Sequence, residues 1–207
     1  MRWLIGLSLT ALLLIAGDTA VRIYAQNTVA SRLERDLSGE GSFEVTLGGF
    51  PFVAGLLAGR IPEAELVAED VERGGLRIDR LTIDIEGLHV SLVAADAGTG
   101  NAEVEWGQGT AVLRVGVLAR FIESRGDVAS VRIDEDGIRV RIPQMGRAIT
   151  APLRLERGRL VIGTPAIEDV IVPLPGALSD IRYETISVSG DRARLTFRLN
   201  NVELRSL

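Results

Sequence analysis

The sequence predicts an α+β fold dominated by curved antiparallel β-sheet wrapped around amphipathic helices. Beyond the N-terminal helical segment, apolar and polar residues alternate with a period of two, which is typical of strands with one buried face. The alternation changes phase around Arg80, because Leu76 and Ile78 are in step whereas Leu81 and Ile83 are shifted by one residue. Such a phase change indicates a β-bulge or a bend, which strongly curved sheets require. Amphipathic helices are expected on the concave side of the sheet at residues 29–37, 53–57 and 117–125.

The first 24 residues are expected to form a signal anchor or a signal peptide, followed by one domain over residues 25–207. Residues 3–17 are apolar apart from one serine and one threonine. As a helix they span about 22 Å, which is shorter than a bilayer core and favours a signal peptide. However, no cleavage site with small residues at −3 and −1 is evident, and Asp18 and Arg22 can pair at i, i+4 so that the helix continues. We therefore favour an uncleaved anchor that runs directly into a surface helix.

Residues 48–59, GGFPFVAGLLAG, form the segment around which the chain is organised. Two glycines open it and permit a positive φ angle or a close backbone approach. Pro51 presets φ for a first helical turn, and Gly59 is placed to end the short helix. Apolar residues at i, i+3 and i+4 form its stripe: Val53, Leu56 and Leu57. The segment either plugs the end of a β core or closes an apolar ligand pocket.

The remaining strands are predicted from alternation and turn residues. In chain order they cover residues 43–47, 63–71, 76–86, 88–92, 103–115, 128–133, 138–142, 147–157, 160–162, 195–199 and 202–204, with another near Ile186. The proline-framed stretch 165–175 is expected to be irregular.

Four short motifs follow one another in this part of the chain: Gly49-Phe50-Pro51-Phe52, Leu57-Ala58-Gly59-Arg60, Gly74-Gly75-Leu76-Arg77-Ile78 and Ile83-Asp84-Ile85-Glu86-Gly87. The series resembles the signature region of the LmeA-type envelope proteins of actinobacteria. This resemblance implies an elongated tubular lipid-binding fold, in which curved sheet wraps helix around an acyl-chain groove. It also implies that residues 25–207 bind a phospholipid or a lipid-linked glycan precursor, in support of envelope lipid or lipoglycan biogenesis or transport. With Arg2 on the cytoplasmic side, the domain is expected on the outer, periplasmic side of the cytoplasmic membrane.

Composition argues against several other classes of function. The net charge is −5, whereas nucleic-acid binding requires a basic patch or stripe. The chain has no cysteine and one histidine, His89, so we expect no metal site, no cofactor and no catalytic residue. His89 lies in a strand pattern and is expected to face solvent. The carboxylates at residues 134–136, followed by Gly137, indicate a solvated hairpin turn rather than a calcium site.

The site expected from this reasoning combines an aliphatic groove with one basic residue at its mouth. Phe50, Phe52, Leu56, Leu57 and Phe121 are predicted to contact the acyl chains, and Arg60 the head group. Two other classes of function remain open. A structural scaffold for envelope glycan-assembly enzymes would have the same fold with a filled groove, and a lipid-modifying enzyme would need His89 beside a serine or aspartate. Protein partners and the identity of the lipid are not specified by the sequence.

Overall fold

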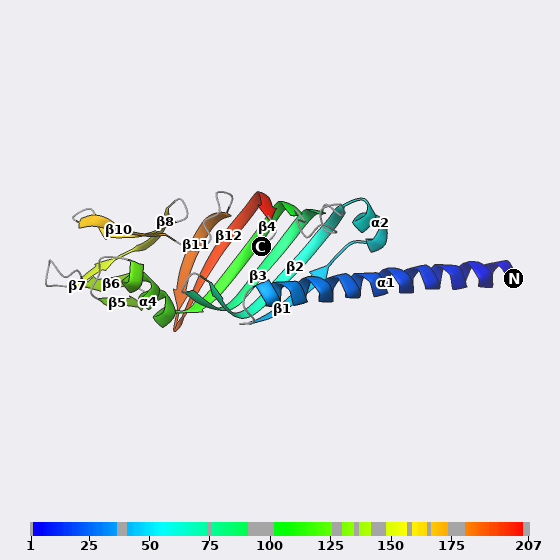
Figure 1. Cartoon of the computed structure of the whole chain (residues 1–207). Helices are drawn as coiled ribbons and strands as arrows, with labels where there is room; N and C mark the ends of the chain where they lie inside the picture. Colours follow the sequence, from blue (N-terminus) through cyan, green and yellow to red (C-terminus); the bar gives the residue numbers. More distant parts are fainter. Residues whose placement is uncertain are drawn as a thin grey trace.

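A computed structural model describes residues 2–36, 41–73, 76–90, 102–125, 130–134, 137–141, 148–156, 159–164, 167–173 and 181–204. The N-terminal helix α1 (Arg2–Asp36) is one continuous element, which confirms that the helix continues past Asp18 into the predicted surface helix. Its N-terminal part extends well beyond the sheet (Figure 1). Within the described part of the chain, no helix is both long enough and apolar enough to cross a membrane.

The main sheet has six antiparallel strands in the order β1-β2-β3-β4-β12-β11. It is open, because its edge strands β1 and β11 do not pair with each other. The strands are β1 (Ser42–Leu47), β2 (Arg60–Arg73), β3 (Leu76–Val90), β4 (Ala102–Arg114), β11 (Ile181–Ser189) and β12 (Arg192–Leu204). The central strands exceed ten residues because each continues through a change of phase without ending. Residues 88–90 of the strand predicted at 88–92 are therefore part of β3, residues 91–92 lie outside the described residues, and the last two predicted strands form β12.

Two three-stranded sheets and helix α4 (Val115–Arg125) lie at the end of the main sheet opposite α2 (Figure 1). Their strands are β5 (Ser130–Asp134), β6 (Gly137–Arg141), β7 (Ala148–Ala151), β8 (Leu153–Glu156), β9 (Arg159–Thr164) and β10 (Ile167–Pro173). The prediction of an irregular stretch at residues 165–175 was wrong for Ile167–Pro173, which forms β10. Pro173 is tolerated there because β10 is an edge strand of its sheet. The predicted strand at residues 147–157 is divided between β7 and β8, which pair in different sheets. The turn residues 74–75 and 135–136 and the helix end at residue 37 lie outside the described residues.

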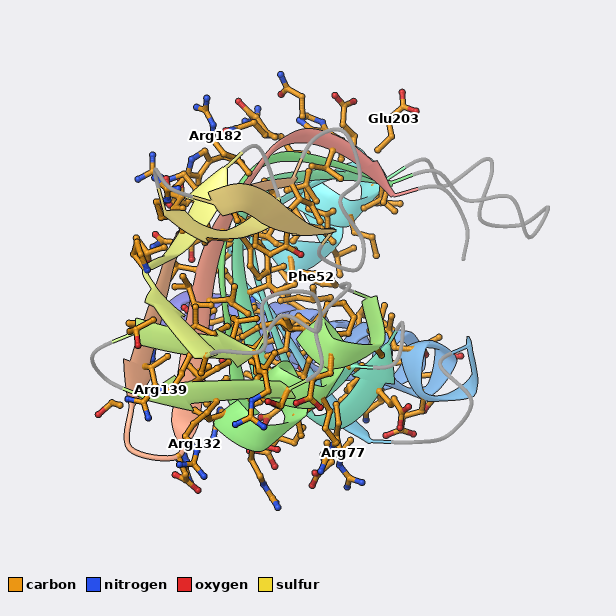
Figure 2. All side chains as sticks on the ribbon, turned by 90° about the vertical axis from the view of Figure 1, so that its left-hand side faces the viewer. Phe52, Arg77, Arg132, Arg139, Arg182 and Glu203 are labelled. Atoms are coloured by element: carbon orange, nitrogen blue, oxygen red, sulfur yellow. The ribbon has the colours of Figure 1, made fainter. Side chains whose placement is uncertain are left out.

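The core lies on one face of the main sheet, which we call the inner face. Helix α4 buries Leu118, Phe121 and Ile122 there, against strand residues such as Leu113 and Leu195. The C-terminal half of α1 packs over the β1–β2 edge, where Ala30 and Leu33 contact Phe43, Ala68 and Val71. The two long helices therefore pack on the inner face, as the sequence predicted. Figure 2 shows the side chain of Phe52 inside the curved sheet, whereas the labelled Arg132, Arg139, Arg182 and Glu203 point outward.

At two levels of the main sheet, the alternation of inner-facing and outer-facing residues shifts by one residue in neighbouring strands. At one level of β2, β3, β4 and β12, successive inner-facing residues are three positions apart instead of two. Ile61, Leu88, Val104 and Val202 form one cross-strand row, and Ala64, Ile85, Gly107 and Leu199 form the next. Positive φ angles at Gly87 (69°) and Asn201 (49°) accommodate the extra residue in two of these strands. The second change, between Ile78 and Leu81 of β3, is the one predicted around Arg80 and lies beside Asp70, whose φ angle is 54°.

Candidate functional site

A pocket of about 270 Å³ lies at the end of the main sheet where α2 (Phe52–Leu57) caps it. Most of its lining comes from the glycine-bounded segment that the sequence singled out. The lining residues are Gly48, Gly49, Phe50, Pro51, Phe52, Gly55, Ala58, Arg60, Ile61 and Pro62. The segment therefore lines a pocket, while its Phe52 is buried in the core, so features of both alternatives that the sequence left open are present.

Backbone geometry shapes this segment. Gly49 has a φ angle of 94° and Gly59 one of 71°, as expected for glycines that allow sharp turns. The N–H of Gly59 donates to the carbonyl of Leu56 at 2.9 Å and so closes the C-terminal end of α2, which confirms Gly59 as the helix stop. Pro51, however, is not in the first helical turn. It precedes the helix in an extended conformation (φ −72°, ψ 129°), and its ring is exposed beside the pocket.

Helix α1 holds this segment through two charged side chains. Asp18 accepts a hydrogen bond from the backbone N–H of Val53 at 2.8 Å, and Arg22 donates one to the carbonyl of Gly49 at 2.6 Å. The two side chains also form the predicted i, i+4 ion pair, at 3.4 Å. The guanidinium of Arg22 lies 5.7 Å from the centre of the Phe52 ring, within the range of a cation–π contact. One turn of α1 thus fixes both ends of the loop that carries the two phenylalanines.

The Asp18 carboxylate is buried, with only 7% of the residue exposed, so its charge must be compensated locally. The hydrogen bond from the Val53 N–H is the largest influence and lowers the pKa of Asp18 below its ordinary value. Burial acts in the opposite direction, and the Phe52 N–H and the Arg22 guanidinium lower the pKa further. Because Val53 lies at the start of α2, Asp18 acts as an N-terminal cap supplied by another helix.

Four of the predicted site residues flank or line the pocket with different exposures. Phe50 is 71% exposed and Leu57 is 75% exposed, whereas Phe52 is 2% exposed and Leu56 is partly buried. Phe52 packs with Leu47, Ile61 and Ala64 in a cluster that includes Leu56 at its margin. Phe52 is therefore both a core residue and a pocket wall, while Phe50 presents its ring to the outside.

Arg60 lies at the pocket, as predicted, at the start of β2. Its exposed guanidinium forms an ion pair with Glu105 at 3.6 Å. Glu105 also lies 3.7 Å from His89, which is exposed and is not among the residues that line the pocket. The prediction that His89 faces solvent is confirmed. Among the described residues, no group of three or more potential ligands is placed to hold a metal ion.

Phe121 does not belong to this site. It is 3% exposed on α4 and packs against the core at the opposite end of the sheet, with Leu113, Leu118 and Ile122. Helical periodicity identified Phe121 as buried but did not indicate which part of the sheet α4 covers. Of the six predicted residues, Phe50, Phe52 and Arg60 thus line the pocket, Leu56 and Leu57 lie on the adjoining helix α2, and Phe121 is separate from them.

A strip of apolar inner face leads away from the pocket, and its residues were not named individually by the sequence prediction of an aliphatic groove. Ile85 and Leu88 contact the Phe52 cluster on one side and the cluster of Val104, Phe197 and Leu199 on the other. Further along, the partly buried residues of this strip are Leu81, Ile83, Ile181 and Tyr183. The alternation of β3 does indicate an apolar face. The register of β2 against β3 makes this face continuous with the pocket, and the sequence does not specify that register.

Comparison with protein families gives a match along nearly the whole chain. The family model described as "LmeA-like phospholipid-binding" matches residues 16–207. This range includes Asp18 and Arg22, the segment they hold, and the whole sheet. Comparisons with curated proteins and with solved structures gave no match.

Proposed function

Because the chain belongs to the LmeA-like phospholipid-binding family, we propose that it holds the acyl chains of a phospholipid against the inner face of the main sheet. The pocket beneath residues 48–59 is then the mouth of the binding site. The observation that carries this proposal is the continuity between the pocket and the apolar strip, through Ile61, Ile85 and Leu88. The tubular arrangement implied by the sequence resemblance is part of this proposal.

The volume of the pocket is informative about what it holds. At about 270 Å³ it lies just below the range of roughly 300–1,000 Å³ typical of complete small-molecule sites. A lipid with two acyl chains therefore requires additional apolar surface, which the partly buried strip along β3 supplies. Each acyl methylene group buried in the protein contributes about 0.8 kcal/mol to the free energy of binding. Removing the same group from a bilayer costs the same amount. A protein that exchanges lipid with membranes therefore needs only an aliphatic surface about as apolar as the bilayer interior to hold the acyl chains.

Arg60 is the proposed contact for the head group. It is exposed at the pocket, and its partner Glu105 is also exposed, so the ion pair contributes little and is easily exchanged for a phosphate. The guanidinium group is well suited to this exchange, because its planar donors match phosphate oxygens in a bidentate manner.

The proposal also includes the place of the protein in the cell. The domain lies on the outer side of the cytoplasmic membrane, held there by the N-terminal part of α1. It supports envelope lipid or lipoglycan biogenesis or transport, with a lipid-linked glycan precursor as the other candidate ligand. Supporting this are the apolar residues 3–17 and the uninterrupted course of α1 into the domain.

Native mass spectrometry of the full chain, extracted from membranes in a mild detergent, tests the binding function. We expect a complex with one phospholipid. The variant Ile83→Gln introduces a polar group on the inner face of β3 and lowers lipid occupancy, whereas Thr82→Gln, on the opposite face of the same strand, leaves it unchanged. Circular dichroism confirms that both variants fold. A lipid-free protein, or equal occupancy in the two variants, would instead favour a scaffold with a filled core.

A further inference from the structure

In the described part of the chain, the exposed large hydrophobic side chains lie on only two segments. Among the described residues, every such side chain lies on α1 or in residues 48–59: Leu14, Ile15, Val21, Ile23, Tyr24, Val29, Phe50 and Leu57. Figure 1 shows α2 beside α1 at the end of the sheet where the helix leaves the domain. By contrast, strands β2 and β3 of the sheet carry ion pairs on their solvent-facing side, such as Arg80–Glu69.

The Asp18–Val53 hydrogen bond fixes the position of α2 along the axis of α1. N-terminal to this contact, the sequence from Trp3 to Gly17 is apolar apart from two hydroxyl residues, and as helix it extends about 22 Å beyond Asp18. C-terminal to it, charged residues appear on α1. The level of Asp18 is therefore the boundary between an apolar and a polar part of the molecule, and Phe50 and Leu57 lie close to that boundary.

We propose that this end is a membrane-docking surface, and that its occupant is the outer layer of a lipid bilayer. Helix α1 enters the lipid with the residues that precede Asp18, and the exposed side chains of Phe50 and Leu57 enter the interfacial layer beside it. This goes beyond the proposed function, because it concerns the surface from which a lipid is collected. Phe50 belongs to both, since it also lines the pocket, whereas Leu57 does not line it.

The charges at this end are compatible with such a position. The loop of residues 48–59 contains no charged residue. The buried carboxylate of Asp18 is compensated by the Val53 N–H and by Arg22, as a charge near the membrane boundary requires. Tyr24 is 75% exposed and follows Asp18 on α1 by about 1.7 turns, and tyrosine is an amphipathic residue typical of membrane interfaces.

Site-specific labelling tests the proposal directly, because the chain contains no cysteine. Leu57→Cys in the full chain carries an environment-sensitive fluorophore on α2. The control is Ser189→Cys, at the exposed turn between β11 and β12 near α4. Both proteins are mixed with vesicles of phosphatidylcholine and phosphatidylglycerol, with and without bromine on the acyl chains. We expect a blue shift and bromine quenching at position 57 and neither change at position 189.

A second measurement separates α2 from α1. The variant Leu57→Ser keeps α1 intact and alters an exposed side chain that does not line the pocket, so it folds normally by circular dichroism. We expect its partitioning onto the same vesicles to fall by roughly tenfold, since a large apolar side chain no longer enters the lipid. Unchanged partitioning, or a label at position 57 that stays in water on bound protein, overturns the proposal. A blue shift that appears without vesicles and grows with protein concentration also overturns it, because the surface then joins two copies. Lipid occupancy by native mass spectrometry is measured separately, so failure here is distinguishable from failure of the proposed function.

Discussion

The carboxylate of Asp18 and the backbone N–H of Val53 lie 2.8 Å apart although 35 positions separate them in the sequence. Together with the Arg22–Gly49 hydrogen bond, this contact makes the N-terminal helix part of the structure of the pocket. A segment that the sequence predicts to be a membrane anchor or a signal peptide thus has a structural role in the domain. It holds the loop that lines the candidate site, and five predictions follow from this arrangement and from the packing around it.

Replacing Asp18 by alanine is expected to loosen α2 without unfolding the sheet. The Val53 N–H loses its acceptor, and the start of α2 loses its cap. Hydrogen exchange measured by NMR should show faster exchange of the Val53 amide, with strands β4 and β12 unchanged. Asp18→Asn, which retains an acceptor oxygen, should give a smaller effect. Asp84→Ala, at an exposed carboxylate on β3, is the matched control and should change neither region.

The pH dependence of the same contact follows from the lowered pKa of Asp18. A carboxyl group whose pKa is lower in the folded protein than in the unfolded chain stabilises the fold when it is ionised. This stabilisation is present above the ordinary value of 3.8 and is lost as the pH falls through the lower folded value. We therefore expect the Val53 amide to be equally protected from pH 8 down to about 5 and to lose protection only in stronger acid. The prediction fails if Asp18→Asn shows the same acid dependence.

The two phenylalanines of the pocket are expected to respond differently to truncation. Phe52→Ala removes a buried ring and should cost about 3–5 kcal/mol in the free energy of unfolding. Phe50→Ala removes an exposed ring and should cost no more than about 0.5 kcal/mol. If Phe50 contacts lipid, its removal should nevertheless weaken the binding of a fluorescent phospholipid several-fold. Thermal unfolding combined with lipid titration measures both quantities, and normal lipid binding by Phe50→Ala would remove this residue from the site.

Arg60→Gln is expected to weaken the binding of anionic phospholipid without changing stability. Its ion pair with Glu105 joins two exposed side chains, and such pairs contribute about 0–1 kcal/mol. Arg80→Gln breaks the comparably exposed pair with Glu69, away from the pocket, and serves as the control. Titration with anionic and zwitterionic lipids should show a loss of affinity only for Arg60→Gln, largest with the anionic lipid. Equal behaviour of the two variants would exclude Arg60 as the head-group contact.

Gly109→Ala is expected to destabilise the sheet. The ring of Phe197 on β12 packs directly over Gly109 of β4, so an added methyl group overlaps its atoms. Overpacking of this kind typically costs about 1–3 kcal/mol. Gly116→Ala is the control, because the position is exposed on α4 with no atom near the added methyl group. There alanine should stabilise the helix by up to about 1 kcal/mol, and chemical denaturation of both variants measures the difference.

The sequence predicts the sheet and the site segment well, because both depend on local pattern. Alternation located most strands of the main sheet, and the shift around Arg80 indicated a real irregularity. The other irregularity, at Gly87, was missed because the change of phase there resembles the start of a new strand. Strand β10 was missed because prolines frame it. In both cases the pairing of neighbouring strands, which is not local information, determines the structure.

Within the site, the sequence identified the correct segment but not the orientation of its side chains. Phe50 and Phe52 are equivalent by composition, and only the start of α2 at Phe52 turns one ring inward and leaves the other outside. The pairing of Asp18 with Arg22 was expected from helical spacing, whereas their contacts with the loop span 35 and 27 positions. An aspartate directly after an apolar helical run is a signal for a buried partner, but it does not indicate which one.

The aligned change of phase across β2, β3, β4 and β12 has a consequence for how the lengths of these strands vary among related proteins. On each side of that level, the inner-facing rows are in register across all four strands. Deleting one residue from one strand between its two rows would exchange its inner and outer faces beyond that level, while its neighbours stayed as they were. Insertions and deletions are therefore expected at the strand ends and in the loops, and at this level of the sheet a change in one strand requires matching changes in the strands paired with it.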